Sequence, residues 1–299
     1  VDYSMRNPLS KMVAEMEPSG IRRFFDVAST MDNVISLGVG EPDFDTPWHI
    51  REEGIYSLEK GRTFYTSNAG LLPLRKEVCT YLKRRFALSY DSDEVIITVG
   101  GSEAIDIAMR AMLDPGDEVL IPQPSYVSYE PCAILANGTP VVIELKEENE
   151  FRLTKEELEA AITPKTKLLV LPFPNNPTGA VMEKKDLEEI AEVIKEHDIF
   201  VLSDEIYAEL TYCGEHVSIA SLPGMKERTV LINGFSKAYA MTGWRLGYAC
   251  APAEILEQML KIHQFAIMCA PTTSQYAAIS ALRNLSLIHI SEPTRHLRI

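Results

Sequence analysis

The chain has 299 residues, of which 46% are hydrophobic and 24% are charged, as is ordinary for a globular enzyme. Its length fits one large α/β domain and part of a second. The net charge of −14 makes duplex nucleic acid an unfavourable partner, because nucleic-acid phosphates have the same sign. No apolar run reaches the about 20 residues of a membrane span, so neither a nucleic-acid nor a membrane partner is expected.

The cysteines argue against two kinds of stabilising cross-link. There are five, they are scattered, and no two form a CxxC pair, which disfavours a disulfide framework and a structural zinc site. The histidines form no cluster either, so we expect no metal. Free cysteines fit a reducing compartment, and a cytoplasmic location is therefore expected.

The first part of the chain has a different pattern from the rest. Residues 9–31 read as a helix interrupted at 18–20, and an apolar segment follows at 34–40. We assign residues 1–46 to the N-terminal segment of a small domain.

Strand-like and helix-like stretches alternate through residues 47–284. Short segments rich in β-branched residues are expected to be strands at 95–98, 118–122, 140–145, 167–172, 199–204, 229–233 and 246–250. Helical patterns lie at 103–113, 154–161, 184–197, 254–265 and 271–283. Thr154 and Glu157 have the spacing of a capping box. Near-continuous apolar strands separated by helices predict an α/β fold with a mostly parallel seven-stranded sheet covered on both faces.

The residue pattern of the sequence changes after Asn284. The string SLIHISEPTRH at 286–296 has no helical or strand period and resembles a translated sequencing adapter. We interpret 285–299 as an artefactual tail. The alternative is a natural frayed tail, whose apolar residues would need a docking partner.

The strongest chemical signal is the string SKAYAMTGWRLGY at 236–248. Lys237 follows a strand in an apolar, glycine-containing neighbourhood, where burial disfavours the charged amine. A neutral amine can attack an aldehyde and form a Schiff base. Arg245 lies eight residues on and its planar fork suits a phosphate. Taken singly, a surface lysine and an arginine at the edge of the core would explain both residues.

This string resembles the SK-x(7)-R signature of class I aminotransferases, which belong to the fold-type-I group of pyridoxal-phosphate (PLP) enzymes. The resemblance runs from about residue 35 to 284, with the landmarks in the family's order. It implies the fold-type-I large domain at 47–284, leading into a partial small domain. It also implies that Lys237 carries PLP and that Arg245 grips its phosphate.

Other landmarks complete the cofactor site that the resemblance implies. The turn GGSEA at 100–104 stands where a helix begins, and free amides at a helix start attract an anion. The resemblance assigns the phosphate to Gly101, Ser102 and Glu103, together with Ser236. It places Tyr126 on the face of the pyridine ring. A plain strand–helix turn and a core tyrosine are the alternatives.

Two further motifs follow predicted strands. In NNPTG at 175–179, Asn176 corresponds to the asparagine that donates to the cofactor's phenolic oxygen. In SDEIY at 203–207, Asp204 corresponds to the aspartate that pairs with the pyridine nitrogen, and Tyr207 to a residue that reaches the phenolic oxygen. Lys237, Asp204 and Tyr207 are thus the predicted catalytic residues, with Lys237 also moving the proton between the substrate Cα and the cofactor's C4′.

Substrate and subunit contacts are also implied. Gly40, in the segment LGVGEP at 37–42, is expected to face the substrate carboxylate, and Tyr65 to reach the phosphate in the other subunit of a homodimer. No residue matches the family's arginine for the substrate α-carboxylate, and we expect that the chain is truncated at its C-terminus and that its activity as written is in doubt.

The predicted reaction is amino transfer between an L-amino acid and a 2-oxo acid. A carbon–sulfur β-lyase with the same site is one alternative. A non-catalytic PLP-binding regulatory module is the other, although such modules usually have an attached DNA-binding domain.

Overall fold

The computed structural model describes residues 6–18, 27, 30–31 and 40–283. Its helices are α1 (Lys11–Glu15), α3 (Trp48–Glu59), α4 (Leu72–Phe86), α5 (Gly100–Met112), α6 (Tyr129–Leu135), α7 (Lys155–Ala161), α8 (Lys184–Glu196), α9 (Ala253–Ala266) and α10 (Thr272–Arg283). Its strands are β1 (Val95–Thr98), β2 (Glu118–Gln123), β3 (Thr139–Glu144), β4 (Thr166–Leu171), β5 (Phe200–Asp204), β6 (Thr229–Gly234) and β7 (Gly247–Cys250). Within these ranges no helix has both the length and the apolarity to cross a membrane.

The strands form one seven-stranded sheet in the order β1-β7-β6-β5-β4-β2-β3. Neighbours from β6 to β3 pair in parallel, whereas β7 runs antiparallel to both β1 and β6. The predicted mostly parallel sheet is therefore confirmed. Because the parallel strands end at one edge, the loops that follow them gather there.

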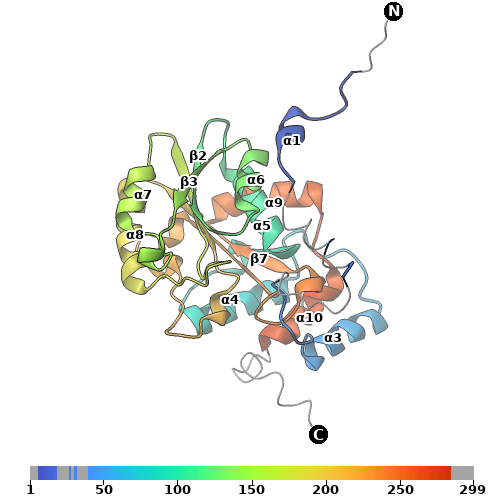
Figure 1. Cartoon of the computed structure of the whole chain (residues 1–299). Coiled ribbons are helices and arrows are strands. Elements are labelled where there is room, and N and C mark those ends of the chain that lie inside the picture. The colour runs from blue at the N-terminus through green and yellow to red at the C-terminus, as the bar shows by residue number, and fades with distance from the viewer. Residues whose placement is uncertain (1–5, 19–26, 28–29, 32–39, 284–299) are drawn as a thin grey trace, which may run out of the picture.

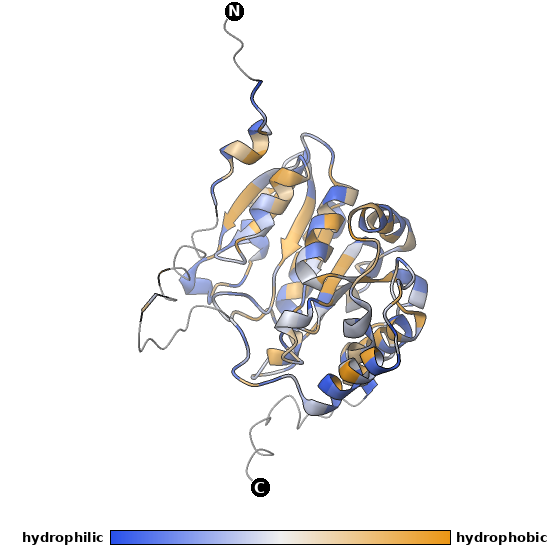
Figure 2. Cartoon of the chain, turned by 90° about the vertical axis from the view of Figure 1, so that its right-hand side faces the viewer, coloured by the Kyte–Doolittle hydropathy of each residue, from blue (hydrophilic) through white to orange (hydrophobic). Residues whose placement is uncertain are grey.

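Helices cover both faces of the sheet, as expected (Figure 1). On one face α5, α6 and α9 pack over a core that includes Ile96, Val170 and Ile232. On the other face α8 and α7 pack over Leu169 and Val201, and α4 and α10 pack near β1. Figure 2 shows hydrophobic strands between helices whose outer sides carry hydrophilic residues. Burial of this apolar surface is the main favourable term in folding.

The expected strands agree with the structure to within a residue or two at most ends. The capping box also forms, since the Thr154 hydroxyl accepts from the Glu157 amide at 3.2 Å. Helices α3, α4 and α6 were not predicted. Of the interrupted helix expected at 9–31, the described residues contain α1, which begins at Lys11 and ends at Glu15 before Pro18. Residues 19–26, 28 and 29 of that stretch lie outside the described residues. The segment expected at 34–40, apart from Gly40, and the tail at 285–299 lie outside the described residues.

The start of α5 lies against β7 with almost no space between the two backbones. A Cβ added at Gly247 would lie 2.6 Å from the carbonyl carbon of Gly100 and 2.7 Å from the amide nitrogen of Gly101. Gly100 itself has a φ of +74°, which residues with a side chain rarely adopt. These glycines let the helix start approach the sheet.

We predict that Gly247→Ala destabilises the protein by about 1–3 kcal/mol, since the new methyl group meets backbone atoms that cannot move aside. Urea unfolding of the variant measures the loss. Gly243→Ala is the matched control, because a Cβ there meets nothing within 4 Å. Equal stabilities of the two variants would contradict the close-packing argument.

Candidate active site

The predicted site residues follow the carboxyl ends of the strands. Asp204 is the last residue of β5, and Asn176 and Lys237 follow β4 and β6. Tyr126 follows β2, and the glycine turn joins β1 to α5. The parallel sheet thus brings together groups that lie far apart in the sequence.

Asp204 is a buried carboxylate, with 7% of its surface exposed. The Tyr129 hydroxyl donates to its Oδ2 at 2.8 Å, and the Ile206 amide donates to its Oδ1 at 3.2 Å. Burial raises the pKa of Asp204, and these two hydrogen bonds only partly oppose the rise. No cationic side chain among the described residues forms an ion pair with it. The carboxylate is therefore suited to a partner that brings its own proton.

Lys237 is the half-buried amine of the site. Burial lowers its pKa, Arg245 acts in the same direction, and Glu41 opposes the shift. Its Nζ lies 5.6 Å from the centre of the Tyr207 ring and donates to the carbonyl oxygen of Gly40. The lowered pKa favours the neutral amine that nucleophilic attack requires.

Three tyrosine rings and one amide lie in the region of this lysine and Asp204. The Asn176 Nδ2 donates to the Tyr207 hydroxyl at 3.4 Å. Burial, with the charge of Asp204 second, raises the pKa of Tyr207. The Tyr126 and Tyr129 rings meet edge to face, with centroids 5.6 Å apart. Tyr126 thus lies beside the residue that holds Asp204.

The start of α5 lies beside Arg245 and carries groups that suit an anion. The guanidinium of Arg245 lies close over Gly100, since a Cβ there would be 2.7 Å from its Nη2. The Arg245 Nη1 donates to the Thr242 carbonyl oxygen at 3.0 Å, which fixes the side chain. The hydroxyls of Ser102 and Ser236 make no hydrogen bond to other residues in the described part of the chain. A helix start, an arginine and free hydroxyls together suit a phosphate.

The carboxylate of Glu103 has other partners. Its Oε2 accepts from the Val99 amide at 2.5 Å, and its Oε1 lies 2.6 Å from Nδ1 of His263 in α9. The side chain therefore caps its own helix and ties it to α9. Only the backbone of Glu103 remains for the predicted phosphate contact.

Among the predicted site residues, Tyr65 does not lie with the others in the structure. Its side chain is 77% exposed and makes no hydrogen bond with the part of the chain that is described. This position fits a contact outside the chain, as the resemblance implies.

The residues present fit PLP by the chemistry of their donor set. A neutral amine suits the aldehyde, a buried carboxylate without a cation suits the ring nitrogen, and the α5 start with Arg245 suits the phosphate. The fit rests on three separate chemical groups, so it is more specific than any one of them.

Two residues of this region were not identified from the sequence. Tyr129 lies three residues after Tyr126, so both rings can lie near the end of β2, and that spacing was the available signal. His263 stood alone in the sequence, and only the fold brings it to Glu103. Its Nε2 is buried and has no hydrogen-bond partner among the described residues.

We predict that Tyr129→Phe raises the pKa of Asp204 further, because it removes a hydrogen bond that favours the carboxylate. Hydrogen bonds to charged groups contribute about 1.5–3 kcal/mol, so unfolding at neutral pH should be easier by that order. An acid whose pKa is higher in the folded than in the unfolded protein contributes stability below the unfolded-state pKa of about 3.9. This contribution is lost as the pH rises through the folded-state pKa. The difference from wild type should therefore shrink on acidification.

Urea unfolding of the two proteins between pH 4 and 8 measures this difference. Tyr126→Phe is the matched control, since its hydroxyl bonds to no other described residue. A pH-independent difference, or one equal to that of the control, would argue against the hydrogen bond.

Comparison with known proteins bears on the whole site. The family model for aminotransferase class I and II matches residues 32–298. A putative aminotransferase, YugH, of Bacillus subtilis is 57% identical over 281 residues, which are 94% of this chain and 73% of the relative. The aromatic-amino-acid aminotransferase 2 of Thermococcus litoralis is 49% identical, over 92% of this chain and 72% of the relative.

The fold gives the same result. The solved aspartate aminotransferase of Thermus thermophilus with maleate superposes with a TM-score of 0.90 at 41% identity, covering 94% of this chain and 74% of that one. These relatives are named as aminotransferases, which favours amino transfer over the β-lyase and regulatory alternatives. The chain belongs to the aminotransferase class I and II family.

Proposed function

We propose that this aminotransferase uses PLP at the site described above and moves an amino group between an L-amino acid and a 2-oxo acid. The observation that carries the proposal is the pairing of Lys237, an amine with a lowered pKa, with Asp204, a buried carboxylate with a raised pKa. Both lie at the ends of β5 and β6, which are neighbours in the sheet. Opposite shifts within one site are typical of acid–base chemistry.

Lys237 has two tasks in this proposal. It would hold the cofactor covalently, and its free Nζ would move the proton between the substrate Cα and the cofactor's C4′. When bound, the cofactor supplies a conjugated ring that accepts the electron pair of the broken Cα bond. The Gly40 carbonyl oxygen, which accepts from Nζ, orients the amine.

Asp204 and the residues around it set the charge of the ring. Its carboxylate holds the proton on the ring nitrogen, and the Tyr129 hydroxyl keeps that carboxylate in place. Asn176 and Tyr207 donate toward the phenolic oxygen, and Tyr126 packs on the ring. Tyr207 lies beside Lys237 and Asn176, and Tyr126 lies beside the Tyr129 ring that contacts Asp204.

The phosphate end is fixed by Arg245, the hydroxyls of Ser102 and Ser236, and the amides of the first turn of α5, including Gly101 and Glu103. Residues 47–284 then form the cofactor-binding domain, and 1–46 belong to the small domain. The five cysteines are unpaired, which supports a reducing, cytoplasmic location.

We predict that Lys237→Ala abolishes fixation of PLP by borohydride, because no amine remains to bond the aldehyde. Peptide mass spectrometry of the wild type should find one adduct, on Lys237. Lys185→Ala is the control, since that side chain is 84% exposed and forms only a surface ion pair. An adduct of unchanged yield in the Lys237 variant would disprove the assignment.

We also propose that two copies share their sites. Phe64, Tyr65, Phe265, Ile267 and Met268 form an exposed apolar surface, 43–87% accessible. Hydrogen bonds hold its two segments together, from Asn68 to the Met268 carbonyl and from Thr272 to the Phe64 carbonyl, both at 2.8 Å. An apolar patch of this kind favours a protein partner.

A second copy is the partner that this surface favours. A surface hollow of about 620 Å³ lies beside Arg245 and is lined in part by Thr242 and Pro271. It leaves room near the phosphate site for Tyr65 of the partner subunit, which the family resemblance places there. The proposal thus accounts for the exposure of Tyr65.

We predict that Phe265→Lys weakens a dimer by at least about tenfold, since two buried ammonium groups would face apolar surface. Sedimentation velocity over a range of concentrations measures the change. Tyr212→Lys is the matched control, because Tyr212 is also 87% exposed but is not one of the residues that form this surface. A monomeric wild type, or equal effects of both substitutions, would refute the shared site.

A further inference from the structure

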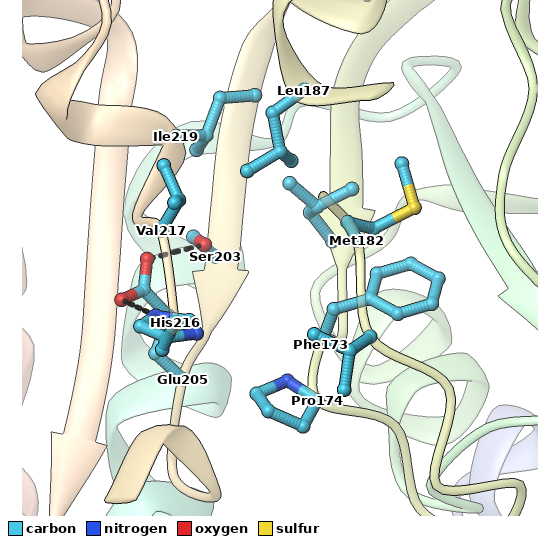
Figure 3. Close-up of a pocket in the computed structure, with 11 residues that line it drawn as sticks. Phe173, Pro174, Met182, Leu187, Ser203, Glu205, His216, Val217 and Ile219 are labelled. Atoms are coloured by element: carbon cyan, nitrogen blue, oxygen red, sulfur yellow. Dashed lines mark hydrogen bonds and ion pairs between the residues drawn. The ribbon is translucent and has the colours of Figure 1, made fainter. Parts of the chain in front are cut away.

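A second buried carboxylate, Glu205, follows Asp204 directly and points to the opposite face of the sheet. Successive residues of a strand alternate between faces. Asp204 faces α6, where Tyr129 holds it, whereas Glu205 lies with Ser203 on the side of α8 (Figure 3). The two carboxylates are thus separated only by the end of β5.

Three donors hold Glu205. Ser203 and Ser218 donate to its Oε1 at 2.9 and 2.6 Å, and Nε2 of His216 lies 2.8 Å from its Oε2. The side chains of Glu205 and His216 are only 2% and 6% exposed. The Phe86 ring packs edge-on against His216, with centroids 5.4 Å apart.

The rest of the surroundings are apolar. Leu171, Phe173, Met182, Leu187 and Ile219 line a cavity of about 10 Å³ beside this network, which has room for about one water molecule. Burying a carboxylate costs several kcal/mol even when it is hydrogen-bonded. An apolar residue would fill the same place without that cost, so the buried charge is expected to have a function.

The electrostatics of the region indicate that role. Burial is the main cause that raises the pKa of Asp204, and the nearby charge of Glu205 raises it further by a smaller amount. Tyr129 and Tyr207 are the other titratable groups whose pKa values the charge of Asp204 raises, and the Tyr126 ring lies against Tyr129. The titratable groups near Glu205 are His216, Tyr90, Tyr248 and Cys250. Glu205 is the carboxylate in this set that acts on Asp204 from behind the sheet.

The backbone of Glu205 has a second link to the site. Its amide donates to the Ile232 carbonyl oxygen of β6 at 2.8 Å, and its carbonyl accepts from Ala208 at 2.9 Å. These bonds close the turn that carries Tyr207. The side-chain network therefore anchors the residue from which the turn starts.

We propose that Glu205 is a positioning residue for the cofactor site. Its charge, held by Ser203, Ser218 and His216, makes Asp204 and the cofactor's ring nitrogen hold their shared proton more tightly. This inference rests on the proposed function, because the ring nitrogen belongs to PLP. Removing the charge should release that proton at lower pH. The turn with Tyr207 should stay in place as long as the hydrogen bonds of residue 205 are kept.

Glu205→Gln separates charge from geometry. The amide keeps an oxygen for both serines and a donor for His216, but it has no charge. We expect the pKa of Asp204 in the cofactor-free protein to fall by about one unit, a tenfold change in proton affinity. Carbon-13 NMR of aspartate-labelled protein measures it, with Asp204→Asn assigning the signal.

The loaded protein gives an independent readout. With PLP labelled by nitrogen-15 in the ring, the nitrogen should lose its proton about one pH unit lower in Glu205→Gln than in wild type. Glu209→Gln is the matched control. Glu209 is a buried carboxylate held by Tyr81 and Arg85, and it does not act on Asp204.

The outcomes distinguish this inference from the proposed function. If wild type takes up no PLP, the proposed function fails, and the ring-nitrogen step fails with it. If PLP binds but Asp204 and the ring nitrogen titrate as in wild type, only the role of Glu205 is overturned. If Glu205→Gln does not fold, Ser218→Ala, which removes the 2.6 Å bond, must move the Asp204 titration, and an unmoved titration overturns the inference.

Discussion

The carboxylate of Asp204 is buried where β5 ends, and the arrangement of the site depends on how that burial is compensated. Two hydrogen bonds, from Tyr129 and from the Ile206 amide, satisfy its oxygens but bring no positive charge. Burial therefore still disfavours the ionised form. A compact positive partner with a proton to share would complete the site, and the ring nitrogen of a bound pyridine has these properties.

The same physical cause acts on Lys237 with the opposite result. Burial raises the pKa of an acid and lowers that of a base, so both groups move toward their neutral forms. The two do not form an ion pair with each other. If they did, each would hold the other in its charged form, and the amine would lose its nucleophilicity. Tyr207 contacts the lysine through its ring, and the charge of Asp204 helps to raise the pKa of its hydroxyl.

The sequence was informative where a local pattern carries the structure. Strands buried on both faces read as apolar runs, and the order of motifs located Lys237, Asp204 and Arg245 at the strand ends. It failed where the structure depends on distant contacts. The pattern of α3 is weak because Trp48 and Leu58 stay exposed. The partner of Glu103 lies 160 residues away, so sequence alone could not separate its capping role from a phosphate contact.

The anion end of the site depends on the strand that breaks the parallel pattern. Gly247 begins β7 and pairs with Thr98 on one side and Gly234 on the other. Because it has no side chain, the first turn of α5 can lie directly on it, and the missing side chain of Gly100 leaves the space that the Arg245 guanidinium takes. Arg245 lies two positions before β7 begins. Thus one antiparallel strand positions both the helix start and the arginine, which explains why the two groups proposed for the phosphate meet although 145 residues separate them.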